Sequence, residues 1–391
     1  MRELIIYTGN FSEPENNAAG KRVYGNSLIL EDLGYDVFLV GKNSEQSLSV
    51  RKQYSEHIFY EPFPNYGLLK VSGYINHFKE IIRNLEQKPV CIIRYGSPSL
   101  SIFDYLLLRY AHQNGIKVIA DVVDWLSADG GNIVFNIIKT IDTYFEKAVF
   151  NKQSDGIIAI SSYLGNYYRR RTTSVAIIPP IVSEYHHNDA DNKVINLVYA
   201  GAPFRLGVRV KNVHKIKDRL DLAIEAFAKT YLEYGDSFVF NVYGITKEQY
   251  LTAFPQHKDL LDKNTETIIF HGRKPMGEVQ KKIMISDYSV LFREVTRGTT
   301  AGFPTKVVES MSCGTPLITT KTSDLPEYIN SGNNGFFVDI DDISTLVKEI
   351  HTILSLSKDE LKIMKNRCFE ECAFLPSKYA DQMDRLLKTI K

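Results

Sequence analysis

The sequence LFREVTRGTTAGFPTKVVESMSCGTPLIT, residues 291–319, begins a longer stretch, Leu291–Tyr328, around which the chain is organised. Its apolar start predicts a strand, and its Gly-, Thr- and Arg-rich middle predicts a loop. Pro304 and Gly314 bracket a short predicted helix, since proline is common at the first position of a helix and glycine just past its last. The run Pro316–Thr319 predicts the next strand.

The start of this predicted helix is suited to an anion. Unpaired N–H groups at a helix N-terminus carry partial positive charge, and the loop before them supplies flexible backbone and two arginines. Glu309 lies about 7–8 Å along the axis from Pro304, at roughly 1.5 Å per residue, which is about the separation of the phosphates and the ribose in a nucleoside diphosphate. One short helix can therefore hold both groups. The alternative is an ordinary buried strand–helix unit with a surface glutamate.

The composition excludes several classes of protein. The 391 residues are 44% apolar and 24% charged, with a net charge of +1. Such a chain is long enough for two globular domains and has no basic excess for binding nucleic acid. No apolar run reaches the roughly 18 residues of a membrane span, and residues 1–7 become polar too soon for a signal peptide. We expect a cytoplasmic protein whose four cysteines are reduced and mostly buried.

Strand and helix patterns alternate along the chain. A strand at residues 4–7, a long polar loop and a helix from about Arg22 to Leu33 form a βαβ beginning. Neither this loop nor the one after a strand at 194–199 contains the G-x-G-x-x-G fingerprint, so a dinucleotide cofactor is not expected, nor is any other cofactor.

The domain boundary is predicted at a polar linker that follows Pro179-Pro180. We predict an α/β fold of two doubly wound, Rossmann-like domains that face each other across a cleft. The domains are expected at residues 1–183 and 190–375, with a C-terminal helix at 376–391 that crosses back to the first domain.

In the N-terminal half, candidate site residues follow predicted strands, where open α/β sheets bind their ligands. Gly20 and Arg22, at the start of the first helix, are candidates for a phosphate contact. The alternative for Arg22 is an exposed residue in the first helical turn. Asp124 and the single tryptophan, Trp125, come directly after another predicted strand.

In the C-terminal half, several cations are expected near one ligand. Lys217 heads a predicted helix after the first long loop, which also carries Arg205, and Arg293 and Arg297 lie on the loop before Pro304. Four cations and a helix dipole match a diphosphate, and we expect two of the four to bind it and the others to be solvated surface residues. The sequence His271-Gly272-Arg273 closes a strand and is placed to flank a nucleobase.

No metal site is predicted. The sequence contains no Walker A motif and no EF-hand loop, and Cys368 and Cys372 have no further cysteine or histidine close by in sequence. We therefore expect a metal-free reaction in which the protein stabilises negative charge on a departing phosphate.

A basic cluster ends the helix that begins near Ser161. It reads Tyr167-Tyr168-Arg169-Arg170-Arg171 and predicts peripheral contact with anionic lipid headgroups. The alternative is a solvated helix terminus, which is the commoner role of such a cluster.

Together these motifs resemble the retaining GT-B glycosyltransferases of family 4, and the resemblance covers nearly the whole chain. The family has Glu-Gly-Phe-Gly, a second glutamate eight residues after the first, and then Ala-Met-Ala-Cys-Gly-x-Pro-Val-Ile; here residues 301–318 read AGFPTKVVESMSCGTPLI. Asp324–Glu327 continues the match. Tyr199–Gly201 with Lys217–Asp221 looks like the family's donor-phosphate segment, and Ala19–Arg22 looks like its N-terminal loop and helix.

The resemblance implies that a sugar is transferred from a UDP- or GDP-sugar, with retention of anomeric configuration, to a glycan or lipid-linked acceptor in bacterial surface polysaccharide synthesis. The donor would bind the C-terminal domain and the acceptor the N-terminal one. By position, Glu309 would bind the ribose and Lys217 the diphosphate, and Gly302, Phe303 and Thr305 would contact donor sugar and phosphate.

Further residues complete the predicted site. Lys306 and Arg273 join the donor-binding set with Arg293, Arg297, Gly20 and Arg22. Asp124 lies where many members carry a histidine or aspartate in the cleft, and it is the candidate catalytic residue.

This chain departs from the family at two positions. Ala301 replaces the first glutamate of the family's pair, and Ala202 stands where an arginine usually follows Gly201. We hypothesise that Arg293 or Arg297 supplies the missing guanidinium, because both lie on the loop that leads into the same helix.

Other functions are less well supported. A non-catalytic protein that binds a nucleotide-sugar fits the loss of the glutamate at 301. A GT-B epimerase has no specific support, and a dinucleotide-dependent oxidoreductase lacks its glycine fingerprint.

Overall fold

The computed structural model describes residues 2–14, 17–42, 51–63, 71–96, 101–125, 133–172 and 174–390. The chain divides into two compact units. Unit 1 contains Met1–Ser183, Ala301–Phe303 and Phe374–Lys391, and unit 2 contains Glu184–Thr300 and Pro304–Ala373.

Unit 1 is built on an eight-stranded sheet in the order β3-β4-β2-β1-β5-β6-β7-β8, in which all pairs are parallel except β3 with β4. The strands are β1 (Leu4–Gly9), β2 (Asp36–Lys42), β3 (Lys52–Gln53), β4 (Ile58–Phe63), β5 (Cys91–Tyr95), β6 (Lys117–Val122), β7 (Gly156–Ala159) and β8 (Val175–Ile177). The helices are α1 (Ala18–Asp32), α2 (Val71–Asn84), α3 (Ser101–Gln113), α4 (Ile133–Phe145), the π-helical turn η2 (Glu146–Phe150), α5 (Asn151–Gln153), α6 (Ser162–Arg169), the 3-10 turn η6 (Pro376–Lys378) and α15 (Ala380–Ile390).

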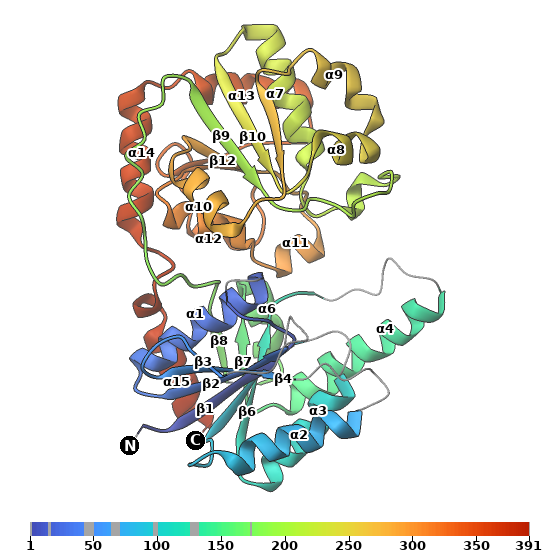
Figure 1. The fold of residues 1–391 in the computed structure, drawn as a ribbon, viewed down its shortest axis with the longest axis vertical. Helices are drawn as coiled ribbons and strands as arrows, with labels where there is room; N and C mark the ends of the chain where they lie inside the picture. Colours follow the sequence, from blue (N-terminus) through green and yellow to red (C-terminus); the bar gives the residue numbers. More distant parts are fainter. Residues whose placement is uncertain are drawn as a thin grey trace. The chain divides into compact units, whose positions relative to one another are not determined.

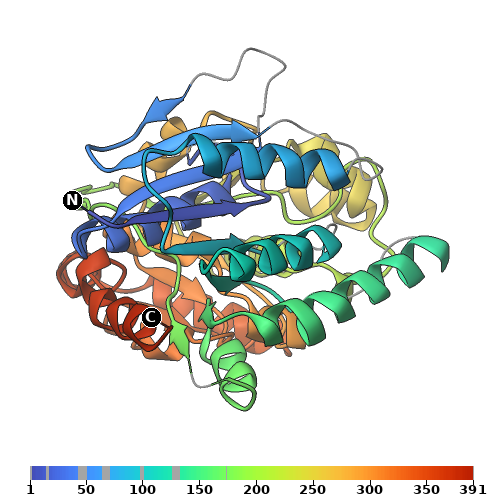
Figure 2. The same ribbon diagram turned by 90° about the horizontal axis from the view of Figure 1, so that it is seen from below.

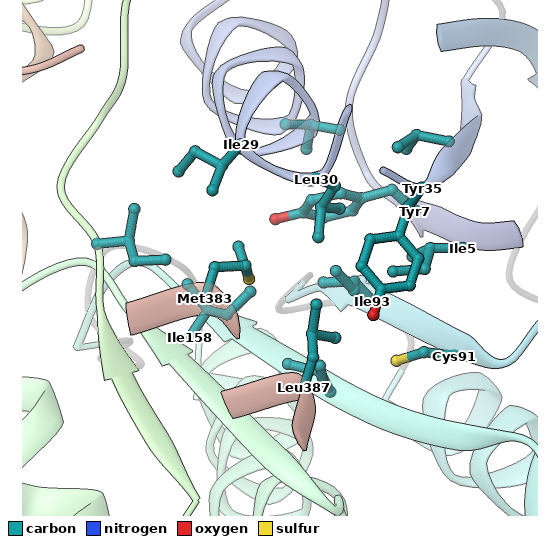
Figure 3. Packing of buried hydrophobic residues seen from close by; sticks show 14 of the residues in the cluster. Ile5, Tyr7, Ile29, Leu30, Tyr35, Cys91, Ile93, Ile158, Met383 and Leu387 are labelled. Carbon is teal, nitrogen blue, oxygen red and sulfur yellow. The ribbon is translucent and has the colours of Figure 1, made fainter. Parts of the chain in front are cut away.

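The core of unit 1 lies between the sheet and the pair α1 and α15. Ile29 and Leu30 of α1 and Met383 and Leu387 of α15 pack against strand residues such as Ile93 (Figure 3). The predicted C-terminal helix begins four residues later than expected, after the 3-10 turn that starts at Pro376. The last residue of the prediction, Lys391, lies outside the described residues. Its apolar stripe explains why it returns to this sheet.

Unit 2 is built on a six-stranded, fully parallel sheet in the order β11-β10-β9-β12-β13-β14. The strands are β9 (Ile195–Ala200), β10 (Phe238–Tyr243), β11 (Ile268–Gly272), β12 (Tyr288–Leu291), β13 (Leu317–Thr319) and β14 (Gly335–Phe337). The helices are η3 (Val213–Lys215), α7 (Leu220–Tyr234), α8 (Lys247–Ala253), η4 (Pro255–His257), α9 (Lys258–Asp262), α10 (Met276–Met284), α11 (Arg297–Ala301), α12 (Thr305–Ser312), η5 (Leu325–Glu327), α13 (Ile343–Leu354) and α14 (Lys358–Glu371).

Both sheets have the doubly wound topology that the sequence predicts. The chain moves in one direction from β9 to β10 and in the other from β12 to β13, so right-handed crossovers place α7 and α12 on opposite faces (Figure 1). The strand order reverses between β9 and β12 in unit 2, and between β1 and β5 in unit 1. The carboxyl ends of these strands are where such sheets bind ligands.

Two local predictions need correction. The segment before Pro304, expected to be all loop, contains the helical turn α11. The helix expected from Lys217 begins at Leu220, because Arg219 still lies outside the helical region of backbone angles. By contrast, α12 agrees closely with its prediction. Pro304 is its N-cap, directly before the first helical residue, and Gly314 adopts the left-handed φ of 62° just past its end.

Candidate functional site

A buried carboxylate collects two cations at the switch point of unit 2. Asp218, on the loop after β9, accepts hydrogen bonds from Arg293 Nε at 2.8 Å and from Lys306 Nζ, and the Tyr199 hydroxyl donates to it at 2.9 Å. Burial alone would raise the pKa of Asp218, but Lys306 and Arg293 outweigh it and lower that pKa to about 2. The carboxylate is therefore ionised and holds both cations in fixed positions.

Three chain segments meet to build this cluster. Asp218 is positioned because the neighbouring Arg219 N–H donates to the Phe292 carbonyl at 2.8 Å, at the end of β12. Arg293 follows directly, and Lys306 comes from the first turn of α12. The Lys306 side chain crosses Gly201, where a Cβ would come within 2.3 Å of the lysine Cε. Its ammonium also lies 5.2 Å from the centre of the Tyr199 ring.

A second layer of charges fixes the loop that carries Arg293. Arg219 pairs with Asp221 at 2.8 Å and also with Glu294. Glu294 pairs in turn with His214 at 2.7 Å. Because Glu294 is the next residue after Arg293, these contacts restrain the backbone from which the Arg293 guanidinium reaches Asp218.

The cations that were expected to act together fall into two groups, those bound to Asp218 and those with exposed side chains. Arg293 and Lys306 share Asp218, whereas Lys217, one residue before Asp218, has an exposed side chain. Arg297, the first residue of α11, and Arg273, directly after β11, are also exposed. Of the two arginines considered as substitutes for the missing family arginine, Arg293 binds Asp218, and Arg297 has an exposed side chain.

The remaining predicted donor residues lie on or just before α12. Thr305 and Lys306 are its first two residues, and Glu309 follows one turn after Lys306 with a half-buried side chain. In the turn that precedes α12, Gly302 is half-buried and Phe303 is buried. Thr305, Lys306 and Glu309 thus occupy the same short helix, as predicted.

The expected nucleobase segment has a stacked aromatic pair. The His271 ring lies parallel to the Tyr243 ring, with centroids 4.4 Å apart, and His271 Nε2 is 2.7 Å from Asn241 Oδ1. Burial, with help from Lys274, lowers the pKa of His271, so its ring is neutral at pH 7. Arg273 is two residues further along the chain.

In unit 1, Arg22 has a different environment from the one that sequence suggested. The alternative of an exposed first-turn residue is wrong, since Arg22 is only 2% exposed and forms an ion pair with the fully buried Asp121, with Nη2 to Oδ1 at 2.6 Å. Its Nη1 donates to the Ile178 carbonyl at 2.9 Å, and Tyr7 completes the network by donating to Asp121 at 2.5 Å. A phosphate contact by Arg22 stays a prediction.

Gly20 and Asp124 lie near the switch point of unit 1. A Cβ at Gly20 would come within 2.5 Å of the Ser12 carbonyl oxygen, so only glycine lets the loop after β1 pack so closely on α1. Asp124, just past β6, accepts a hydrogen bond from the Trp125 N–H at 2.9 Å. Burial, together with the charges of Asp121 and Asp124, raises the pKa of Tyr95 to about 12. This shift places Asp124 close to Tyr95, at the end of β5.

An acidic cluster that the sequence did not reveal lies beside the end of β5. Burial raises the pKa of Glu146, in η2, to about 8, and Asp104 and Asp142 add to the shift. Burial likewise raises the pKa of Asp104 to about 6, although Arg94 pairs with it at 2.5 Å. Glu146 is therefore protonated at pH 7 in the folded chain.

This shift predicts how Glu146→Gln changes stability with pH. The folded carboxyl keeps its proton up to about pH 8, whereas the unfolded one loses it above 4.5, so the contribution of Glu146 to wild-type stability falls between these values. Glutamine mimics the protonated acid. The variant's gain in Tm over wild type should therefore grow by roughly 3–5 °C between pH 5 and pH 8. Thermal unfolding of both proteins at pH 5 and pH 8 measures this difference in Tm, with the exposed Glu86→Gln as control. An equal gain at both pH values would contradict the raised pKa of Glu146.

The described residues contain neither a group of metal ligands nor a helix that could span a membrane. No group of three or more His, Cys, Asp or Glu side chains that could hold a metal occurs within the described ranges. None of the described helices is both long and apolar enough to cross a membrane. Cys91, Cys313 and Cys368 are buried free thiols and Cys372 is half-buried, as expected.

Comparison with known proteins gives matches, one of which includes the segment that holds this cluster. Residues 210–368 match the family model described as Glycosyl transferases group 1, and this segment holds Asp218, Arg293, Lys306 and Glu309. Over 180 residues the chain is 29% identical to a Salmonella typhimurium protein named for colanic acid biosynthesis, the glycosyltransferase WcaL. The match covers 44% of this chain and 43% of WcaL. The Escherichia coli WcaL is 30% identical over 159 residues, 40% of this chain and 37% of the relative. The chain thus matches less than half the length of these relatives.

Solved structures extend the similarity to the whole chain. Sucrose-phosphate synthase from Thermosynechococcus elongatus superimposes with a TM-score of 0.71 at 15% identity, covering 100% of this chain and 99% of the other. The Anabaena protein Alr3699/HepE, solved in complex with UDP, gives a TM-score of 0.65 at 12% identity and full coverage of both chains. The fold is GT-B. The predicted architecture of two Rossmann-like domains, each with a parallel sheet, is thereby confirmed.

Proposed function

We propose that the chain is a glycosyltransferase that moves a sugar from a UDP- or GDP-sugar to a glycan or lipid-linked acceptor in bacterial surface polysaccharide synthesis. The observation that carries the proposal is the cluster of Lys306 and Arg293 on Asp218, beside the N-terminus of α12 and one turn from Glu309. It is supported by the group 1 match over this segment, by the polysaccharide role in the WcaL name and by the UDP complex of HepE.

The cluster has the properties that a diphosphate leaving group requires. Lys306 and Arg293 bring two positive charges against the single charge of Asp218, so a net positive charge remains for the phosphates. The first amides of α12 add a partial charge of the same sign, directed along the helix axis. As the glycosidic bond breaks, these groups stabilise the negative charge that develops on the departing nucleoside diphosphate.

Asp218 and Glu309 have different tasks in this proposal. Asp218 fixes the two cations before the donor arrives, which limits the reorganisation that the reaction needs. Glu309 accepts hydrogen bonds from the ribose hydroxyls. Arg293 serves in place of the arginine that the family usually has at the position of Ala202. The exposed Lys217, Arg273 and Arg297 complete the proposed donor-binding set.

Transfer and hydrolysis assays test the proposal. The intact chain is incubated with a panel of UDP- and GDP-sugars, with and without EDTA, and the anomeric configuration of the product is read by NMR. We expect one donor to be consumed, retention of configuration, and no effect of EDTA. Inversion would refute retention, a strict requirement for a divalent ion would refute the metal-free reaction, and binding of a donor that is never consumed would favour the second candidate.

That second candidate is a GT-B protein that binds a nucleotide-sugar without transferring it. It is favoured by Ala301, a buried alanine where the family has a carboxylate near the donor sugar. The nucleotide-binding cluster on Asp218 would serve either function, so only turnover separates them.

Glu309→Ala should weaken binding of the donor nucleotide about 10- to 100-fold without unfolding the chain. A hydrogen bond to a charged group contributes roughly 1.5–3 kcal/mol, and the Glu309 side chain is only half-buried. Calorimetric titration with UDP and GDP measures the change, with the exposed Glu266→Ala as control. Unchanged affinity would remove Glu309 from the site.

Asp124→Asn should lower turnover about 100-fold or more while leaving donor affinity nearly intact. Asparagine keeps the oxygen that accepts the Trp125 N–H, so the local fold should survive. Comparing kcat with donor Kd for the consumed nucleotide-sugar distinguishes the two effects. Equal turnover in the variant would clear Asp124 of a catalytic role.

A further inference from the structure

Helix α4 exposes its apolar side to solvent and directs polar residues toward the rest of unit 1. The side chains of six apolar residues on it are between 52% and 70% exposed, namely Val134, Phe135, Ile137, Ile138, Ile141 and Tyr144. On the other side, Asp142 accepts a hydrogen bond from the Ser101 N–H at 3.1 Å, and Thr143 is buried. A surface helix of a globular protein normally has the reverse orientation.

The neighbouring helix α3 extends the apolar surface. Ile102 and Leu106, one turn apart on α3, are 55% and 39% exposed. α3 and α4 are packed together, and both views show α4 extending away from the sheet of its unit (Figures 1 and 2). The exposed apolar side chains of α4 and α3 together exceed the scattered exposed residues of an ordinary surface.

Cations and aromatic rings border the apolar surface. Lys147 lies 4.1 Å from the centre of the Trp125 ring, and Arg171 lies 3.9 Å from that of Tyr167. Trp125 and Tyr167 are themselves in edge contact, with centroids 5.0 Å apart. Aromatic rings with one apolar and one polar side, next to lysine and arginine, are typical of the membrane–water interface.

A groove between α4 and α6 is lined by Lys147 and Arg171 together with a third cation, Lys152. Its volume is about 620 Å³, and its walls carry Lys147, Lys152 and Arg171 without an acidic residue among the described residues that line it. The Thr143 hydroxyl, also in its wall, is buried and has no hydrogen-bond partner in the described structure. The groove therefore offers positive charge and an unused hydroxyl directly beside the exposed apolar helix.

We propose that α4 and its basic border form a docking surface for an anionic lipid bilayer. The six apolar side chains of α4 enter the boundary between headgroups and acyl chains, and Lys147, Lys152 and Arg171 meet the lipid phosphates. A helix of this kind binds through buried apolar area together with attraction to anionic lipid. The positive charge of the border favours a bilayer as the partner. A second copy of this chain is less suitable, because it would place the same cations against each other and they would repel. The inference does not depend on the transfer reaction.

Sedimentation of the intact chain with lipid vesicles, without nucleotide, tests the proposal. Wild type should bind vesicles of phosphatidylcholine with phosphatidylglycerol, and bind less at high salt because exposed charges are screened. Ile137→Ser/Ile141→Ser should reduce binding at least about tenfold, and Lys152→Ala/Arg171→Ala should reduce it toward the level on phosphatidylcholine alone. The matched control is Ile285→Ser/Ile363→Ser, two exposed isoleucines of unit 2.

The outcomes are distinct. Thermal unfolding first confirms that each variant is folded. Failure of wild type to bind anionic vesicles, or equal binding by wild type and Ile137→Ser/Ile141→Ser, would overturn the proposal. Self-association in solution that this variant abolishes would assign the surface to a second copy instead and would also overturn it.

Discussion

Lys306→Ala is expected to weaken binding of UDP or GDP by the intact chain about 10- to 100-fold. The ammonium is the charge that α12 places beside the N-terminal amides of the helix, and a charge-assisted contact to phosphate contributes roughly 1.5–3 kcal/mol. Arginine is not an equivalent residue at position 306. The Lys306 side chain passes so close to Gly201 that a Cβ at 201 would clash with it, and the guanidinium of an arginine is larger than the ammonium of a lysine. Titration calorimetry with each nucleotide measures the effect.

The controls separate this cluster from general surface charge. Lys281→Ala removes an exposed cation from α10 in the same unit and should leave nucleotide affinity unchanged. Arg293→Ala should weaken binding, whereas Arg297→Ala should have a smaller effect, because Arg293 is held on Asp218 beside Lys306 and the Arg297 side chain is exposed. If Lys306→Ala and Arg293→Ala both bind nucleotide as wild type does, the Asp218 cluster is not the diphosphate site.

Asp121→Asn is expected to destabilise unit 1 by about 3–5 kcal/mol, the cost of removing one partner from a buried ion pair. The variant leaves the Arg22 guanidinium charged and enclosed, since the arginine is only 2% exposed. Asparagine also loses part of the hydrogen bonding that Asp121 provides to Tyr7 and Arg22. Chemical denaturation, followed by a probe in unit 1, measures the loss.

A double variant tests whether the unpaired charge of Arg22 causes the loss of stability in Asp121→Asn. Arg22→Met/Asp121→Asn removes both charges and should be less destabilised than Asp121→Asn alone, because no unpaired charge is left in the core. The exposed Asp32→Asn should change stability by less than about 0.5 kcal/mol. A loss for Asp121→Asn as small as that of Asp32→Asn would show that the buried pair does not stabilise the unit.

The fold could be predicted because local sequence specifies it. Strands such as Leu4–Gly9 and Ile195–Ala200 are rich in apolar residues, and they alternate with helical patterns in the way a parallel sheet requires. Pro304 and Gly314 likewise fix the ends of α12 through backbone geometry alone, which is why that helix was placed to within one residue.

The candidate site could be predicted only in part. The position of Glu309 followed from its spacing from the helix start, and Lys306 was included in the donor-binding set. The importance of Asp218, however, depends on Tyr199, Arg293 and Lys306, which are distant from it in sequence. The burial of Arg22 could not be predicted for the same reason, because its partner Asp121 is 99 residues away in sequence. The Glu146 cluster was missed because its pKa depends on neighbours that only the fold brings together.

The most direct test of the account is a crystal structure of the chain with UDP or GDP bound. The account predicts that the diphosphate contacts Lys306 and Arg293 at the N-terminus of α12 and that the ribose hydroxyls contact Glu309. A nucleotide bound at any other place on the chain, with Lys306 and Arg293 still held by Asp218 alone, would contradict it.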